Sequence, residues 1–213
     1  MKRFECACFV VKHGWASYLL HFAREHDIFG GTIFYGTGTV KSSLLRALSL
    51  DRVEREVVIM AAEKKYTRRI MEMLSQKLDM KKEHHGIAFS MPVKVYIGGV
   101  HREDEDNEEE DENMYNAITL VTEKGKAEEA LDAAQDAGAT GGVIINARGA
   151  GRHEKSKFMF MDIEPEKEVL IMVAPREKTD AIVEAVNDRM KISEPGNGIM
   201  MVQEVSKIYG TSI

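Results

Sequence analysis

The sequence predicts an α+β fold made of two tandem β-α-β-β-α-β units, each with an antiparallel sheet. The first observation is an internal repeat, because the block Gly30–Val40 (GGTIFYGTGTV) returns as Gly141–Gly151 (GGVIINARGAG). The second is that the flanking blocks recur at nearly one offset, 111 residues at the double glycine and 112 residues afterwards. The third is that strand and helix patterns follow the same order in both copies. Together they indicate a tandem duplication. The recurring flanks are Arg55–Met60 with Lys167–Met172, Lys65–Thr67 with Glu177–Thr179, and Gly86–Phe89 with Gly198–Met201.

The domain organisation follows from the repeat and from one acidic segment. A chain of 213 residues can hold two units of about 100 residues, each large enough for a core. We expect a first unit at 1–100, a linker at 101–113 and a second unit at 114–213. Nine of the 35 acidic residues lie in 103–112, where like charges repel and favour a solvated tether. A cation-binding segment is the alternative interpretation.

Apolar runs of strand length, and apolar residues at helical spacing, define the first unit in order. The run Phe4–Lys12 predicts a strand that ends at His13-Gly14. The helix expected at Trp15–His26 has an inward stripe of Trp15, Tyr18, Leu19, Phe22 and Ala23. The helix at Lys65–Leu78 places Ile70, Met71, Leu74 and Leu78 inward. The remaining elements are strands at Gly31–Tyr35, Val53–Ala61 and Gly86–Ile97, and a connection at Gly36–Arg52 with a possible short helix at Ser42–Leu50.

The second unit repeats this order. Its first helix, Lys126–Asp136, has an inward stripe of Ala127, Ala130, Leu131 and Ala134, and its second helix is expected at Lys178–Met190. The strands are expected at Tyr115–Thr122, Gly142–Arg148, Glu168–Ala174 and Gly198–Ile208, with a loop at Gly149–Pro165 in which Phe158–Met161 could extend as strand. The order is that of a ferredoxin-like unit, in which two helices cover one face of the sheet.

The other face of each sheet also needs cover. Val143–Ile145 and Val169–Met172 are apolar at consecutive positions, so both of their faces require burial. We therefore expect the chain to self-associate.

The N-terminal sequence and the length of the apolar runs predict a cytoplasmic protein. The start Met1–Glu5 lacks the apolar region of a signal peptide, and no apolar run approaches the roughly 20 residues that span a bilayer. We expect a protein that is not membrane-embedded and has no nucleic-acid partner. The two cysteines, Cys6 and Cys8, face the same way on one strand and are interpreted as small buried apolar residues, with a metal or redox pair as the alternative.

The glycine-rich loops do not match the common nucleotide-binding fingerprints. Gly149-Ala150-Gly151-Arg152 lacks the third glycine of a dinucleotide site, and Val40 precedes Lys41 where a phosphate loop requires glycine. Two interpretations stay open: an anion site of loop amides with Lys41, Arg148 or Arg152, or flexible loops with ordinary basic residues. Catalytic motifs are absent from the sequence and the histidines, His84, His85 and His153 among them, are scattered, so we expect no enzyme activity.

The second repeat resembles the PII nitrogen-regulatory signalling proteins. The resemblance is carried by Ala139–Val143 with Arg148–Arg152, by the apolar strand that ends at Pro175, and by Pro195–Ile199. The first repeat is similar over Phe29–Thr32 and Gly36–Val40.

This resemblance implies a trimer of ferredoxin-like units that binds ATP, ADP or another small anion between units, with 2-oxoglutarate in some members and no fixed cofactor. It also implies a regulated target in nitrogen metabolism, which is a transporter, an enzyme or a regulator. Two departures are that Ile199 stands where the family has a lysine and that the family's basic C-terminal segment is missing. The alternative function is a ferredoxin-like scaffold, or a metal or small-ligand module, without nucleotide. The effector-site candidates are Thr140, Arg148, Gly149, Gly151, Arg152, Gly196 and Gly198, with Gly36, Gly38 and Lys41 in the first repeat.

Overall fold

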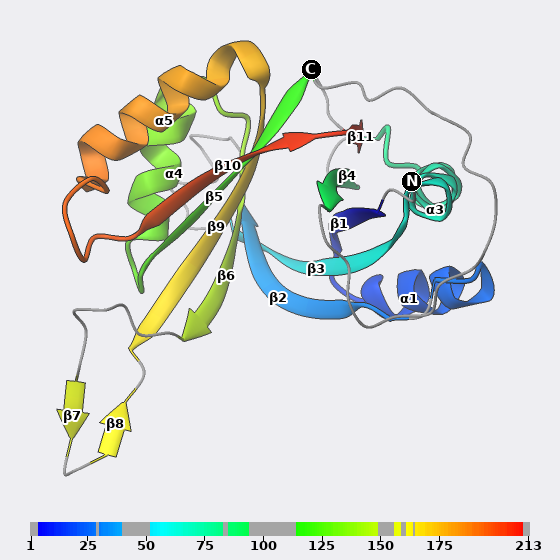
Figure 1. The fold of residues 1–213 in the computed structure, drawn as a ribbon, viewed down its shortest axis with the longest axis horizontal. Helices are drawn as coiled ribbons and strands as arrows, with labels where there is room; N and C mark the ends of the chain where they lie inside the picture. Colours follow the sequence, from blue (N-terminus) through cyan, green and yellow to red (C-terminus); the bar gives the residue numbers. More distant parts are fainter. Residues whose placement is uncertain are drawn as a thin grey trace. The chain divides into compact units, whose positions relative to one another are not determined.

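The computed structural model divides the chain into two compact units that share its segments unevenly (Figure 1). Unit 1 comprises Met1–Tyr35, Glu54–Tyr115 and Glu204–Ile213, and unit 2 comprises Gly36–Val53 and Asn116–Gln203. The described residues are 4–28, 30–39, 52–82, 85–93, 114–148, 156–158, 161–163 and 165–210. Each unit therefore takes in a segment that the sequence repeat assigns to the other half.

Unit 1 contains the first β-α-β-β-α-β order that the repeat predicts. Its elements are β1 (Phe4–Lys12), α1 (Ala16–Glu25), β2 (Thr32–Thr39), β3 (Arg52–Glu63), α3 (Lys64–Lys77), β4 (Gly86–Val93) and β11 (Lys207–Tyr209). The strands lie in the order β2-β3-β1-β4-β11, and β1 is antiparallel to both β3 and β4. The C-terminal strand β11 therefore forms the outer edge of the first unit's sheet.

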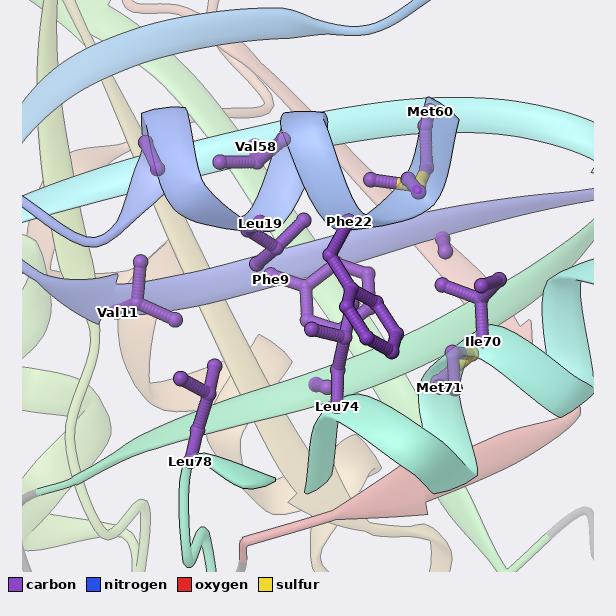
Figure 2. Packing of buried hydrophobic residues seen from close by; sticks show 14 of the residues in the cluster. Phe9, Val11, Leu19, Phe22, Val58, Met60, Ile70, Met71, Leu74 and Leu78 are labelled. Carbon is purple, nitrogen blue, oxygen red and sulfur yellow. The ribbon is translucent and has the colours of Figure 1, made fainter. Parts of the chain in front are cut away.

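The core of unit 1 lies between the helices and one face of this sheet (Figure 2). Alternation along β1 turns Ala7, Phe9 and Val11 toward the helices, where all three are buried. The inward stripe predicted for α3 is confirmed, because Ile70, Met71, Leu74 and Leu78 all belong to this core. In α1 the prediction is wrong at one position: Tyr18 is 48% exposed, and Ala16 takes its place in the core.

Unit 2 repeats the architecture. Its elements are β5 (Tyr115–Glu123), α4 (Ala127–Asp136), β6 (Val143–Arg148), β9 (Glu166–Pro175), α5 (Arg176–Met190) and β10 (Ile199–Val205). The strands lie in the order β10-β5-β9-β6-β2, and α4 and α5 lie side by side on one face (Figure 1). The stripe predicted for α4 is confirmed, since Ala127, Ala130, Leu131 and Ala134 are all buried. Both units thus have the predicted α+β fold.

Burial on both faces of β6 is also confirmed. Ile144 belongs to the core beneath the helices, and its neighbours Val143 and Ile145, which point the other way, are 2% and 8% exposed. This burial exists within one chain. The self-association expected from the same residues stays a prediction.

Apart from shifts of one or two residues at the ends of elements, the described residues differ from the prediction in three places. β2 continues through Thr39, so its last residues form strand rather than connection, and the last strand breaks at Ser206 into β10 and β11. The expected loop at Gly149–Pro165 includes a two-stranded hairpin, β7 (Ser156–Phe158) with β8 (Met161–Ile163). The first two differences arise because a distant strand offers a pairing edge, β6 to β2 and β4 to β11, which local spacing does not show. In the hairpin, β7 pairs with its neighbour β8. The expected helix at Ser42–Leu50 and the acidic linker lie outside the described residues.

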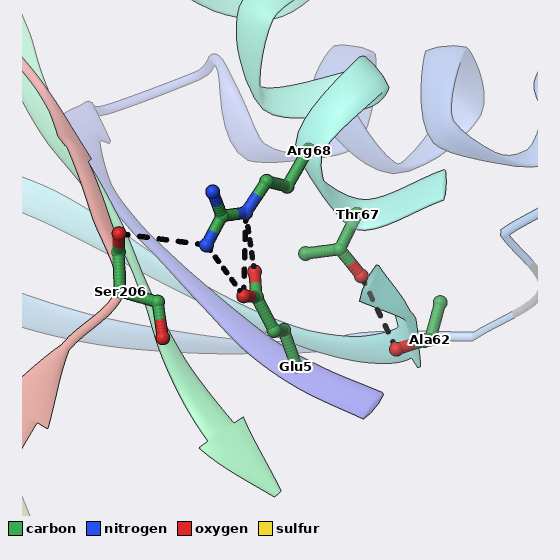
Figure 3. A network of polar contacts seen from close by, with 5 residues as sticks. All are labelled: Glu5, Ala62, Thr67, Arg68 and Ser206. Atoms are coloured by element: carbon green, nitrogen blue, oxygen red, sulfur yellow. Dashed lines mark hydrogen bonds and ion pairs between the residues drawn. The ribbon is translucent and has the colours of Figure 1, made fainter. Parts of the chain in front are cut away.

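A buried ion pair joins three segments of unit 1 (Figure 3). Arg68 Nη2 on α3 donates to Glu5 Oε1 on β1 at 2.8 Å, and the two side chains are 5% and 2% exposed. The same guanidinium reaches the carbonyl oxygen of Ser206 at 3.4 Å. Next to it, Thr67 donates to the carbonyl oxygen of Ala62 at 3.3 Å. The ion pair therefore links the C-terminal segment at Ser206 to β1 and α3.

Candidate functional site

The polar residues of unit 2 gather at the end where β5 and β6 finish and β9 begins. Arg148, the last residue of β6, lies opposite Glu166 in the antiparallel register. The backbone N–H of Lys124 donates to the carbonyl oxygen of Glu166 at 3.3 Å, which adds the end of β5 to the group. On the far side of β5, Gly198 lies so close to Val121 that a Cβ would meet its carbonyl oxygen at 2.5 Å.

Charges at this end are mostly paired with one another. Lys124 Nζ lies 2.8 Å from Glu166 Oε2, and Lys126 Nζ lies 2.6 Å from Glu123 Oε2. Arg148 is exposed, and within the described part of the chain no hydrogen bond or ion pair holds its guanidinium. Because a guanidinium presents a planar fork of donors, this side chain is suited to a carboxylate or a phosphate.

A carboxylate from the third strand caps the first helix of the unit. α4 begins after Lys126, which has no side-chain oxygen to accept a helix N–H. Glu168 on β9 supplies that oxygen, since its Oε2 accepts from the backbone N–H of Ala127 at 3.0 Å. The arrangement satisfies one of the otherwise unpaired first-turn N–H groups and places negative charge at the helix N-terminus.

Unit 1 has the same device at the equivalent positions. Glu56 Oε2 accepts from the N–H of Ala16 at 2.7 Å, and Glu56 is 6% exposed. His13 Nδ1 lies 3.4 Å from Glu56 Oε1, and His13 is also in ring contact with Tyr35. The repeated blocks Arg55–Met60 and Lys167–Met172 thus contain a capping carboxylate, which none of the sequence motifs above predicts. The sequence feature that indicates this carboxylate is the glutamate that follows a basic residue at the start of both blocks.

The loop between α5 and β10 is held in a defined shape. Lys191 ends α5 with φ +54°, and the Asn187 side chain accepts from the N–H and the hydroxyl of Ser193 at 3.0 and 2.8 Å. Asn197 Nδ2 donates to the carbonyl oxygen of Lys191 at 2.9 Å, and Thr122 Oγ1 donates to that of Asn197 at 3.3 Å.

The two glycines of this loop have different reasons to be glycine. Gly196 has φ +98° with nothing within 4 Å of a Cβ, so it meets a backbone requirement alone. Gly198 has φ +141° and also needs its close approach to β5. One end of unit 2 therefore holds Arg148 together with Gly196 and Gly198. Between Arg148 and the two glycines lie the last residues of β5 and the first residues of β9.

Thr140 lies at the opposite end. It is exposed and precedes β6, which begins at Val143. Val143 pairs with Ile171 at one end of the β6–β9 ladder, and Arg148 lies at the other end. The strand from Val143 to Arg148 spans about 17 Å at roughly 3.3 Å per residue. Within one unit, a small anion bound at Arg148 does not reach Thr140.

Gly36 and Gly38 form part of a strand in the structure and do not line a loop. They pair with Ile145 and Val143 on β6. A Cβ on Gly36 would lie 2.9 Å from the carbonyl oxygen of Ile144, so the close approach of two strands accounts for this glycine. The remaining candidates, Lys41, Gly149, Gly151 and Arg152, lie outside the described residues.

The thiols and histidines of the described residues do not form a metal site. Burial raises the pKa of Cys8 to about 12 and also raises the pKa of Cys6, so both thiols stay protonated at neutral pH. His85 Nδ1 lies 2.9 Å from the carbonyl oxygen of Leu78, and its ring meets Trp15 edge-on. No group of three or more His, Cys, Asp or Glu residues is arranged for a metal within the ranges that the structure describes.

A comparison with family models matches residues 115–212 to Nitrogen regulatory protein P-II. The second repeat is a P-II domain. The matched range begins at the first strand of that repeat and ends beyond β11, and the first half of the chain has a similar β-α-β-β-α-β architecture. No curated protein matches the chain in sequence.

Solved structures that the chain is similar to include GlnK from B. subtilis, at 20% identity over 44% of this chain and 86% of that chain, with a TM-score of 0.35. The GlnK–ATP complex from B. subtilis matches at 19% identity over 46% and 94%, with a TM-score of 0.36. Arabidopsis thaliana PII bound to citrate matches at 15% identity over 45% and 78%, with a TM-score of 0.36. Among the described residues of this chain, no helix is long and apolar enough to cross a membrane.

Proposed function

We propose that this chain is a P-II-like regulatory protein whose second unit binds a small anionic effector and whose bound state controls a partner protein in nitrogen metabolism. The observation that carries the proposal is the P-II domain at 115–212, with an exposed Arg148 that has no partner among the described residues and lies at the same end as a pre-shaped glycine loop. The protein works without catalysis, in the cytoplasm, as a homo-oligomer of three chains, and its target is a transporter, an enzyme or a regulator.

An adenine nucleotide is the first effector to test. Arg148 lies at the entrance to Gly149–Arg152, where the sequence adds a second arginine and two glycines. A guanidinium holds two phosphate oxygens at once, and backbone N–H groups beside glycine add neutral donors for the remaining oxygens. Citrate is the second probe, because a similar solved protein is described as bound to it. The 2-oxoglutarate of some P-II proteins is the third.

The test is calorimetry on the whole chain with ATP, ADP, citrate, 2-oxoglutarate and inorganic phosphate. We expect a nucleotide to bind and Arg148→Ala or Arg152→Ala to weaken its binding at least tenfold, since a hydrogen bond to a charged group contributes about 1.5–3 kcal/mol. The matched control is Arg176→Ala, an exposed arginine at the start of α5, which should bind as the wild type does. Equal binding by all three variants would place the effector elsewhere.

A scaffold without nucleotide is the second candidate. Ile199 favours it, because this residue stands where the resemblance calls for a lysine and its side chain is 62% exposed. If the wild type binds none of the five probes, the sensor proposal fails and the scaffold replaces it. A thermal-shift screen with divalent metals then tests the metal-binding form of that candidate, since a ligand of the folded state raises its stability.

A further inference from the structure

The guanidinium of Arg148 lies beside two carboxylates of β9 and pairs with neither of them. Arg148 on β6 is directly opposite Glu166 in the antiparallel register, and Glu168 is its diagonal neighbour on the same face. Opposite charges at such positions attract each other across the strands. Within the part of the chain that the structure describes, the Arg148 side chain nevertheless makes no ion pair. Other groups must therefore hold the two carboxylates.

Each carboxylate is held by a different donor. Glu168 Oε2 accepts from the backbone N–H of Ala127 at 3.0 Å, at the start of α4. Glu166 Oε2 lies 2.8 Å from Lys124 Nζ, and the backbone N–H of Lys124 donates to the carbonyl oxygen of the same glutamate at 3.3 Å. The backbone bond places these two residues next to each other, which favours the pairing of their side chains. Both carboxylates are thus taken, and the guanidinium of Arg148 is left to the solvent.

Unit 1 lacks this arrangement at the equivalent positions. With the offset of 111 residues, Thr37 stands at the position of Arg148 and His13 at the position of Lys124. His13 lies 3.4 Å from the helix-capping Glu56 instead. The lysine–glutamate pair therefore occurs in the unit that keeps the arginine.

We propose that the Lys124–Glu166 ion pair sets the affinity of the effector site by keeping the Glu166 carboxylate off Arg148. This inference rests on the proposed function, in which Arg148 holds the effector. With Glu166 bound to Lys124, the whole fork of guanidinium donors faces an incoming anion. Without Lys124, Glu166 turns to the arginine opposite it, and an anion must then displace a carboxylate. Lys124 is therefore a positioning residue, which acts through Glu166 and does not touch the effector.

A double-mutant cycle separates this role from direct contact with the effector. Calorimetry of the whole chain with ATP, or with citrate if ATP does not bind, compares the wild type, Lys124→Met, Glu166→Gln and the double variant. Both side chains are more than half exposed, at 53% and 62%, so the substitutions leave the core intact. We expect Lys124→Met to weaken binding about three- to fivefold, as the loss of an exposed ion pair does, and to have no effect when Glu166→Gln is already present. Equal losses in both backgrounds would overturn the proposal, because Lys124 would then act on the effector directly.

Two controls separate position from net charge. Lys126→Met removes the same charge two residues further on, where the lysine lies 2.6 Å from Glu123, and should bind the probe as the wild type does. Lys124→Arg keeps a cationic donor for Glu166 and should retain the wild-type affinity. If Lys126→Met weakens binding as much as Lys124→Met, the loss reflects net charge alone and the proposal is wrong.

A measurement without effector tests the ion pair by itself. Phenylglyoxal modifies exposed arginines, and mass spectrometry of the digested chain gives the rate at Arg148, with the exposed Arg176 as internal reference. We expect the rate at Arg148 to fall about threefold in Lys124→Met and to recover in the double variant with Glu166→Gln. An unchanged rate in Lys124→Met would overturn the proposal, whether or not an effector binds. If the rate falls but the wild type binds no probe, the proposed function fails, while the role of Lys124 in keeping Arg148 free is retained.

Discussion

The buried ion pair of unit 1 gives a sharp test of how the two ends of the chain are held together. Arg68 Nη2 lies 2.8 Å from Glu5 Oε1, and its Nε lies 3.3 and 3.4 Å from the two carboxylate oxygens. Water is excluded, since the side chains are 5% and 2% exposed. Removal of one member leaves the other charge buried without a counter-ion, which costs about 3–5 kcal/mol.

We therefore expect Arg68→Met to lower the free energy of unfolding of unit 1 by about 3–5 kcal/mol. The double variant Glu5→Met/Arg68→Met should recover most of this loss, because apolar replacement of a whole buried pair is often neutral. The control is Arg69→Met, an exposed neighbour on the same helix, whose loss should cost less than about 0.5 kcal/mol. Urea denaturation followed by the fluorescence of Trp15 reports on unit 1, because Trp15 is the single tryptophan and lies in that unit.

The contact between Arg68 and Ser206 adds a second readout. In Arg68→Met the amide of Ser206, which is bonded to the carbonyl oxygen of Ser90, should exchange faster than in Arg69→Met, because β11 loses one of its attachments to unit 1. The reasoning would be refuted if Arg68→Met were as stable as Arg69→Met. A double variant no more stable than the single would also refute it, because the loss would then not come from an uncompensated charge.

Two further predictions concern the helix cap and the buried thiol. Glu168→Gln should keep the shape of the side chain but weaken its hydrogen bond to the N–H of Ala127, which lowers the free energy of unfolding by up to about 1 kcal/mol. The control is Glu184→Gln, at an exposed position, which should leave the free energy of unfolding unchanged. Urea denaturation followed by circular dichroism measures both variants. Cys8 has its folded-state pKa raised to about 12, so its contribution to stability is present in full below the unfolded thiol pKa and declines as the pH rises through 12. Wild type should therefore lose more stability than Cys8→Val between neutral and strongly alkaline pH; equal slopes in pH-dependent urea denaturation would show that Cys8 does not titrate as its burial implies.

The sequence by itself determined the duplication, the order of elements and most of the inward faces. These follow from local periodicity, which fixes the side of a strand or helix that a residue occupies. The stripe Ile70, Met71, Leu74 and Leu78 is an example, because four apolar residues at helical spacing have one way to be buried together. Tyr18 is an exception, because it fits the apolar spacing of α1 but its side chain is exposed.

The tertiary structure decided which edges pair and which ends meet. Three findings depend on segments far apart in the chain: β11 completes the sheet of unit 1, Gly36 and Gly38 pair with β6 as part of a strand, and Thr140 lies a strand's length from Arg148. Periodicity predicts which face of its own strand a side chain occupies. It does not predict which strand lies next to that strand, or at which end of the sheet a loop emerges. Those are set by backbone hydrogen bonds between distant strands, and these bonds have no pattern in the sequence of either partner alone.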